Sequence, residues 1–123
     1  MKDPKDKRKF KRFPLPVAHY EGMDGKHVHG VSDVWDVSRS GFRILSLAPI
    51  PKGTVLHFRI NVPNVLDIIC EGEVRWGGTA SGKMYWHGLI FKEIDPTDKM
   101  ELLNYGYDSW LESEKMNHLL KDS

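Results

Sequence analysis

The sequence has little of what several protein classes require. It contains one cysteine, Cys70, in 123 residues, so no internal disulfide can form and a reducing compartment is expected. No apolar run is long enough to span a membrane, and no apolar segment follows the charged N-terminus as it would in a secretory signal. The formal net charge is only +1, which argues against a surface that coats nucleic acid. These features predict one cytoplasmic globular domain.

The groupings typical of enzymes are also missing. No Ser-His-Asp set, pair of carboxylates or phosphate-binding loop stands out, and Cys70 lies in the apolar run 65–70, where it reads as a small buried hydrophobe. His27 and His29 share one face of a predicted strand and could hold a metal. Because no clear third ligand accompanies them, a solvent-facing pair is favoured. We therefore expect a protein that is not an enzyme and has no metal or cofactor.

Charge is distributed unevenly along the chain. Residues 1–12 contain seven Lys or Arg and two Asp, a net charge of +5, so the other residues sum to −4. A basic arm on a mildly acidic body indicates a local anionic partner, although a solvated tail that aids solubility is the alternative. Arg8 and Arg12 lie on one face of the arm, and their planar guanidinium groups can pair bidentately with phosphate or with the O6/N7 edge of guanine.

Short alternating segments separated by Gly and Pro follow the arm, a pattern typical of antiparallel barrels. Residues 77–82 are expected to form a loose hairpin connection, and Gly88 to leave room for close packing. The pattern predicts a closed or nearly closed six-stranded antiparallel β-barrel. Its strands are expected at residues 13–20, 26–36, 42–47, 55–62, 65–76 and 83–94.

A helical pattern follows the last strand. Asp95 and Pro96 are suited to the start of a helix, so residues 97–120 are predicted to be helical, and Gly106 and Ser109 mark places where the helix could break. An apolar stripe at helical spacing is expected to pack on the barrel or on another subunit, in preference to binding a cofactor. The stripe consists of Met100, Leu103, Tyr107, Trp110 and Leu111.

The predicted elements divide the chain into three parts. Residues 1–12 form a flexible basic arm, because they contain too little apolar surface to order themselves. Residues 13–94 form the barrel, and residues 95–123 form the C-terminal helical segment.

The stretch Asp36-Val37-Ser38-Arg39-Ser40-Gly41 joins the second and third predicted strands. Asp36 and Ser38 are two residues apart, so on an extended strand both side chains leave the same face. Gly41 allows a positive φ, or lets a ligand approach where a Cβ would block it. Together they would form a small polar recess that accepts N–H donors and that a flat ring could approach. An ordinary turn, with Asp36 bonding to nearby backbone N–H groups, is the alternative.

Two of these motifs together resemble the PilZ domain family. Arg8-xxx-Arg12, followed by Asp36-x-Ser38-x-x-Gly41 inside an all-β pattern, is similar to the family's signature. Residues 73–76 and 86–91 also resemble the family's later strands, so the resemblance covers about residues 7–94. It implies a six-stranded barrel that binds cyclic di-GMP, the bacterial second messenger, with the arginine arm closing over the ligand.

The resemblance also implies roles for individual residues. Trp76 is similar to a position that can pack on a guanine, although a core residue at the end of the barrel is an equal alternative. Lys7 precedes the first arginine, at a position that influences whether one or two ligand molecules bind. The implied ligand-binding residues are Arg8, Arg12, Asp36, Ser38 and Gly41.

The sequence thus predicts a stand-alone cyclic di-GMP receptor that relays ligand level to an unidentified effector protein. We expect a monomer or weak homodimer with no DNA, RNA or membrane partner. One alternative is a PilZ-like adaptor that contacts proteins independently of ligand. The other is a small barrel that binds single-stranded nucleic acid through the arm and aromatic side chains, which the modest net charge disfavours.

Overall fold

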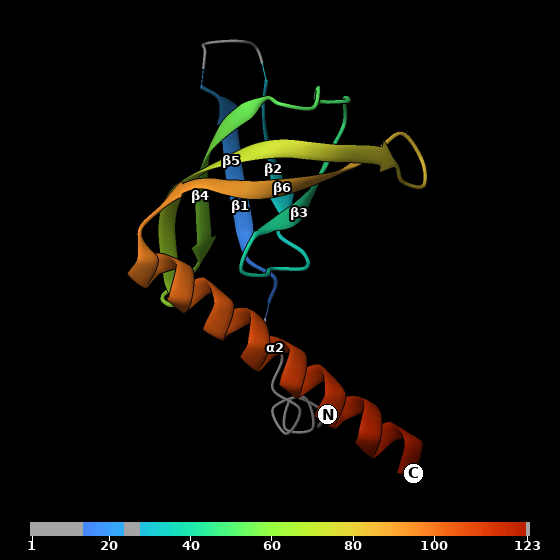
Figure 1. Cartoon of the computed structure of the whole chain (residues 1–123). Helices are drawn as coiled ribbons and strands as arrows, with labels where there is room; N and C mark the ends of the chain where they lie inside the picture. Colours follow the sequence, from blue (N-terminus) through green and yellow to red (C-terminus); the bar gives the residue numbers. More distant parts are fainter. Residues whose placement is uncertain (1–13, 24–27, 123) are drawn as a thin grey trace.

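The computed structural model describes residues 14–23 and 28–122, with side chains described as far as residue 115. Within these residues, six strands are followed by one long helix (Figure 1). The elements are β1 Val17–Gly22, β2 His29–Asp33, β3 Gly41–Ser46, β4 Val55–Val62, β5 Leu66–Thr79, β6 Tyr85–Ile94 and α2 Pro96–Asp122.

All six strands belong to one antiparallel sheet in the order β2-β1-β4-β5-β6-β3. The sheet curls, so that the two edge strands β2 and β3 approach each other (Figure 1). A few bonds join these edges: the Leu45 N–H donates to Ser32 Oγ at 2.9 Å, and Trp35 and Arg43 exchange backbone hydrogen bonds of 2.9 and 2.8 Å. The predicted six-stranded barrel with a C-terminal helix is confirmed, as a curled sheet whose seam is partly closed.

Alternating side chains of the central strands form the core. In β4, which has its predicted bounds, Leu56, Phe58 and Ile60 are fully buried, because every second residue of a strand faces the interior. Ile68 and Cys70 of β5 lie opposite them in the ladder and are also buried. The prediction that Cys70 is a buried hydrophobe is therefore confirmed.

Several strand ends differ from the prediction for local reasons. β1 begins at Val17 because Pro14 and Pro16 have no N–H to donate to a ladder. β2 ends at Asp33, and the chain beyond it leaves the extended conformation at Asp36, whose φ is 53°. β5 continues through residues 77–79, which pair with residues 85–87 of β6, where a loose connection was expected.

Helix α2 begins as predicted. The Asp95 carboxylate accepts hydrogen bonds from the N–H groups of Thr97 and Asp98 at 2.8 and 3.3 Å, which caps the first turn. The helix continues through Gly106 and Ser109 without a break. Among the described residues, no helix has the length and apolar character needed to cross a bilayer.

The face that α2 turns toward the barrel is not the predicted stripe. Met100, Tyr107 and Trp110 are 57%, 59% and 55% exposed, whereas Leu102 and Tyr105 are buried. The barrel therefore covers only part of the predicted stripe, and packing of its exposed part on another subunit stays a prediction. Apolar residues occupy two neighbouring faces of the helix, and periodicity alone cannot choose between them. The helix also extends beyond the end of the barrel (Figure 1), so its second apolar face has no strand to cover it.

Candidate ligand-binding site

One pocket, of about 280 Å³, gathers the predicted site residues of the described chain. Asp36, Ser38, Gly41 and Trp76 all line it, although Trp76 is separated from the others by more than thirty residues. Arg8, Arg12 and Lys7 lie outside the described residues. The wall is formed by three segments of the chain, and the additional lining residues are Ser40, Phe42, Arg43, Arg75, Gly88, Leu89 and Ile90.

The connection between β2 and β3 is a tight, self-bonded loop. The Ser38 N–H donates to the Gly41 carbonyl at 2.8 Å, and Ser38 Oγ lies 3.2 Å from Ser40 Oγ. Asp36 and Ser38 do not lie on an extended strand, so the expected shared strand face is wrong. A left-handed φ of 53° at Asp36 turns the chain there instead. Both side chains nevertheless line the pocket, because the loop folds over it.

Gly41 is required by packing, and the close approach of a ligand at this glycine stays a prediction. Gly41 does not have a positive φ, so the expected left-handed turn at this residue is wrong. A Cβ at this position would lie 1.7 Å from the Leu89 carbonyl oxygen of β6, far inside van der Waals contact. Gly41 therefore lets β3 begin directly against β6, and this contact brings the loop to the pocket wall.

Asp36 already has a partner within the protein. Its carboxylate lies 2.6 Å from a terminal guanidinium nitrogen of Arg43 on β3. Arg43 also lies over the Trp86 ring, 4.3 Å from its centroid, and Trp86 packs edge-on against Trp35 at 5.0 Å. This aromatic support fixes the guanidinium, so Arg43 holds the Asp36 carboxylate in place. Sequence reasoning missed Arg43; its charge on an otherwise apolar strand two residues after Gly41 was the available signal.

An irregularity in β5 brings Arg75 and Trp76 to the same pocket. Val74 pairs with Leu89 and Trp76 pairs with the adjacent Gly88, so Arg75 is an extra residue in the ladder. Neighbouring residues of a regular strand point to opposite faces, and a bulge of this kind re-aims them. Sequence reasoning also missed Arg75, because a bulge leaves no mark in the alternation of side chains.

Trp76 presents its ring at the pocket and does not complete the core. It is 48% exposed, and its indole lies against Gly88, where a Cβ would be 1.9 Å from the indole nitrogen Nε1. The expected close packing at Gly88 is thus provided by Trp76. The alternative that Trp76 is a core residue at the end of the barrel is wrong.

The described residues show a binding pocket with few groups suited to catalysis or metal binding. No group of three or more His, Cys, Asp or Glu side chains among them could hold a metal ion. His29 is exposed, and its predicted companion His27 lies outside the described residues. Burial, together with the nearby carboxylates of Asp98 and Glu71, raises the pKa of Cys70 to about 12, which disfavours the nucleophilic thiolate. Arg43 and Arg75 outnumber Asp36 in the pocket, so its charge suits an anionic ligand.

Comparison with known proteins places this fold among solved structures of low sequence identity. It is similar to the Bacillus subtilis inhibitor of motility MotI/DgrA (17% identity, TM-score 0.65), covering 80% of this chain and 48% of that one. It is similar to K. pneumonia MrkH in its apo state (14% identity, TM-score 0.66), covering 86% of this chain and 51% of that one. The Borreliella burgdorferi PlzA protein, solved in complex with c-di-GMP, shares 18% identity at a TM-score of 0.54, covering 84% of this chain and 37% of that one.

The chain thus spans about half, or less, of the length of these structures. No curated protein sequence matches it. Residues 6–108 match the PilZ domain family, which includes both motifs and the start of α2 and confirms the resemblance noted in the sequence. The chain belongs to the PilZ domain family.

Proposed function

We propose that this protein is a receptor for cyclic di-GMP. The observation that carries the proposal is the single pocket that gathers Asp36, Ser38, Gly41 and Trp76 from segments far apart in the sequence. PilZ family membership supports it, as does the complex of PlzA with c-di-GMP. The proposed site uses no catalysis and no metal.

The pocket's chemistry suits a ligand with two guanines and two phosphates. Asp36 and Ser38 offer oxygen acceptors for the guanine N1–H and N2 amino donors. Arg43 and Arg75 offer guanidinium donors for a phosphate or for the guanine O6/N7 edge. The exposed ring of Trp76 offers a flat surface on which a base can stack.

Arg8 and Arg12 are the proposed clamp from the N-terminal arm. Arg12 is closer in the sequence than Arg8 to β1, which begins at Val17, so we propose that Arg12 is the better anchored of the two. Lys7 is proposed to influence whether one or two ligand molecules bind. Closure of the arm over the pocket would change the surface that a cytoplasmic effector protein contacts, which is how ligand level would be relayed.

A calorimetric titration with cyclic di-GMP tests the proposal and measures stoichiometry and affinity together. We expect saturable binding by the wild-type protein. If no heat of binding and no competition between ligands is detected at high cyclic di-GMP concentration, the receptor function is rejected. The ligand-independent adaptor would then be the remaining protein-binding function. Binding of single-stranded oligonucleotides that grows with length and falls steeply with salt would instead support a nucleic-acid function.

A further inference from the structure

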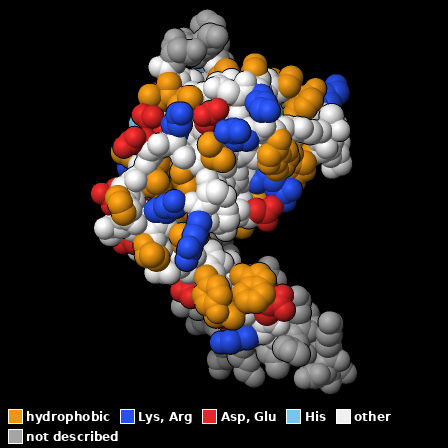
Figure 2. Space-filling model, in the orientation of Figure 1, with side chains coloured by type: hydrophobic (Ala, Val, Ile, Leu, Met, Phe, Trp, Pro, Cys, Tyr) orange, Lys and Arg blue, Asp and Glu red, His pale blue; other side chains and the backbone are white. Residues whose placement is uncertain are grey.

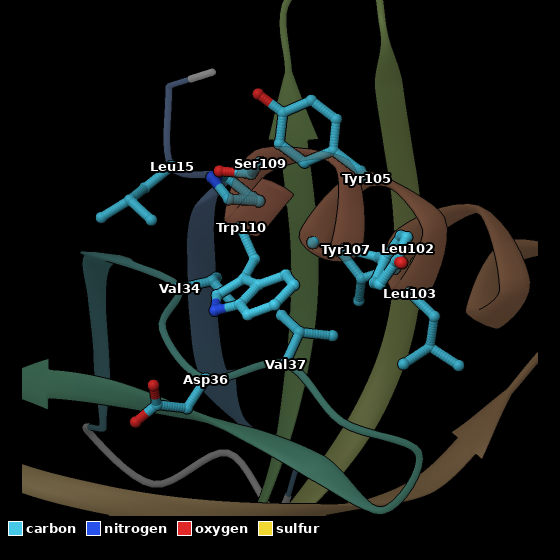
Figure 3. Close-up of a pocket in the computed structure, with 12 residues that line it drawn as sticks. Leu15, Val34, Asp36, Val37, Leu102, Leu103, Tyr105, Tyr107, Ser109 and Trp110 are labelled. Carbon is cyan, nitrogen blue, oxygen red and sulfur yellow. The ribbon is translucent and has the colours of Figure 1, made fainter. Parts of the chain in front are cut away.

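A second hollow, of about 460 Å³, lies between α2 and the barrel. We call it the helix groove. Figure 3 shows the Trp110 indole between Val34 and Val37, with Leu15 and Asp36 at the rim. Most of the groove is apolar, and Asp36 also lines the ligand pocket, so the two hollows are neighbours.

The helical wall of the groove carries two large aromatic side chains that remain more than half exposed. Tyr107 and Trp110 are 59% and 55% exposed, and their ring centroids are 6.1 Å apart. Figure 2 shows hydrophobic side chains gathered on α2, with acidic side chains beside them. An exposed apolar patch with a polar rim is typical of a contact surface.

The net charge of α2, the helix that forms one wall of the groove, favours a basic occupant. Between residues 96 and 115, α2 contains five Asp or Glu and two Lys, a net charge of −3. Residues 1–12 have a net charge of +5 and contain Phe10 between Lys9 and Lys11. Residues 1–12 therefore have a charge opposite to that of the helix. They also contain an aromatic side chain that could pack in the groove.

That segment starts at the groove. The Tyr105 hydroxyl of α2 donates a 2.6 Å hydrogen bond to the Pro14 carbonyl, which holds the base of the arm at the groove's edge. Trp110 lies five residues after Tyr105, about 7.5 Å along the helix axis. Phe10 lies four residues before Pro14 and can reach roughly 13 Å from it. The arm can thus reach Trp110, and the covalent tether gives it a high effective concentration there.

We propose that residues 1–13 dock in the helix groove when no ligand is bound, with Phe10 against Tyr107 and Trp110 and basic side chains against carboxylates of α2. The sequence predicts a flexible arm because the arm lacks apolar surface of its own, and the groove supplies that surface. If the proposed cyclic di-GMP site is correct, docking also keeps Arg8 and Arg12 from the pocket until ligand competes for them.

Disulfide trapping in the ligand-free protein tests the docked arm. The variant Lys11→Cys/Ser109→Cys places one thiol beside Phe10 in the sequence and one in the groove wall. It keeps Phe10, the two aromatic residues of the helix and both arginines of the arm. The native Cys70 is buried, with a pKa of about 12, and stays unreactive. The control is Lys11→Cys/Met100→Cys, because Met100 is 57% exposed on the same helix, five residues from Tyr105 in the other direction.

Under mild oxidation, we expect an intramolecular disulfide in Lys11→Cys/Ser109→Cys at least ten times faster than in the control, measured by non-reducing peptide mapping. Adding Trp110→Ala, or raising the salt to about 1 M, where the screening length is about 3 Å, should slow it several-fold. Equal rates in both pairs would show that the arm does not prefer the groove. A disulfide-linked dimer would assign the groove to a second copy of the chain. Either result overturns the proposal, whether or not the protein binds cyclic di-GMP.

Discussion

Arg43 illustrates how single side chains of the pocket are held by partners within the protein. Its guanidinium contacts the Asp36 carboxylate at 2.6 Å and the Trp86 ring at 4.3 Å, while its buried Nε has no hydrogen-bond partner among the described residues. In the proposed site, a ligand would meet an Asp36 carboxylate that already has a partner in Arg43. Binding there would add donors to an existing ion pair, which reduces the cost of ordering the acid.

Arg12→Ala should weaken cyclic di-GMP binding by at least tenfold. Loss of a bidentate guanidinium contact costs about 1–3 kcal/mol, and each factor of ten corresponds to about 1.4 kcal/mol. Stability without ligand should change by less than about 0.5 kcal/mol, as for most surface substitutions. Calorimetry and thermal unfolding measure the two effects. Lys11→Ala removes the same charge from the neighbouring position and should bind nearly as wild type; equal losses in both variants would indicate a non-specific charge effect.

Cyclic di-AMP should bind at least tenfold more weakly than cyclic di-GMP. Adenine does not present the N1–H and N2 amino donors that Asp36 is proposed to accept, and loss of a hydrogen bond to a charged group costs about 1.5–3 kcal/mol. Competition between the two ligands measures the ratio. Asp36→Asn should reduce the ratio of the two affinities, because the charged acceptor is lost. Similar affinity of the wild-type protein for both ligands would mean that phosphate contacts dominate.

Gly41→Ala should destabilise the fold by about 1–3 kcal/mol, the usual cost of an overpacked site. The added Cβ would lie 1.7 Å from the Leu89 carbonyl oxygen, which belongs to the backbone and cannot rotate away. Gly78→Ala is the matched control, because its Cβ would meet nothing within 4 Å. Denaturant unfolding of the two variants should separate them. An unfolding free energy of Gly41→Ala equal to that of the control would contradict the close strand contact.

At the scale of secondary-structure elements, His87 joins β6 to the end of β3. The Ser46 hydroxyl donates its one proton to the Ala48 carbonyl at 2.5 Å, so it accepts from His87 Nε2–H at 2.9 Å. His87 Nδ1 is then an unprotonated nitrogen, buried and without a partner among the described residues. Burial lowers the pKa of His87 below its ordinary value of 6.5, although the Ala48 carbonyl opposes the shift. Protonation of Nδ1 would therefore place a charged donor in a buried position where no described residue accepts its hydrogen bond.

Acid should weaken the fold through this histidine. Below pH 6.5 the unfolded chain binds a proton that the folded protein binds only at lower pH, so the free energy of unfolding falls as pH decreases through that window. One proton contributes at most about 1.4 kcal/mol per pH unit. Denaturant unfolding between pH 7.5 and 5 should show this slope in the wild type and a smaller slope in His87→Gln. His29→Gln removes an exposed histidine and should keep the slope of unfolding free energy against pH. A slope that disappears in His29→Gln would show that the pH dependence does not come from His87.

At the scale of the whole molecule, two neighbouring hollows are proposed to compete for one arm. The ligand pocket and the helix groove share Asp36, and the arm's base is bonded to α2 at Pro14. In this proposal, an arginine of the arm pairs either with a carboxylate of α2 or with a ligand in the pocket. Ligand binding would then release the arm from the groove and expose Tyr107 and Trp110. The ligand-free and ligand-bound proteins would therefore present different surfaces.

Saturating cyclic di-GMP should therefore slow disulfide formation in Lys11→Cys/Ser109→Cys severalfold. For the same reason, Trp110→Ala should bind the ligand more tightly than the wild type, because apparent affinity falls with the fraction of arm that is docked elsewhere. Quantitative mapping of the disulfide and calorimetry measure these effects. A disulfide rate that does not respond to bound ligand would show that the two positions of the arm are compatible.

Local patterns in the sequence determined most of the fold. Alternation of apolar residues located β4 at its observed bounds, Asp95 and Pro96 marked the start of α2, and the apolar run around Cys70 indicated its burial. These predictions succeed because strands and helix caps depend on neighbours two to four residues away. The two motifs that resemble the family likewise depend only on residue types and order.

Contacts between distant segments decided the rest. The β5 bulge that turns Arg75 into the pocket, the approach of β6 that requires Gly41, and the choice of Leu102 and Tyr105 as the buried face of α2 were not predicted. A period of 2 or 3.6 residues states which side chains share a face, but not which backbone packs against that face. Only the assembled sheet defines those neighbours, so the pocket wall and the helix groove were decided by tertiary structure.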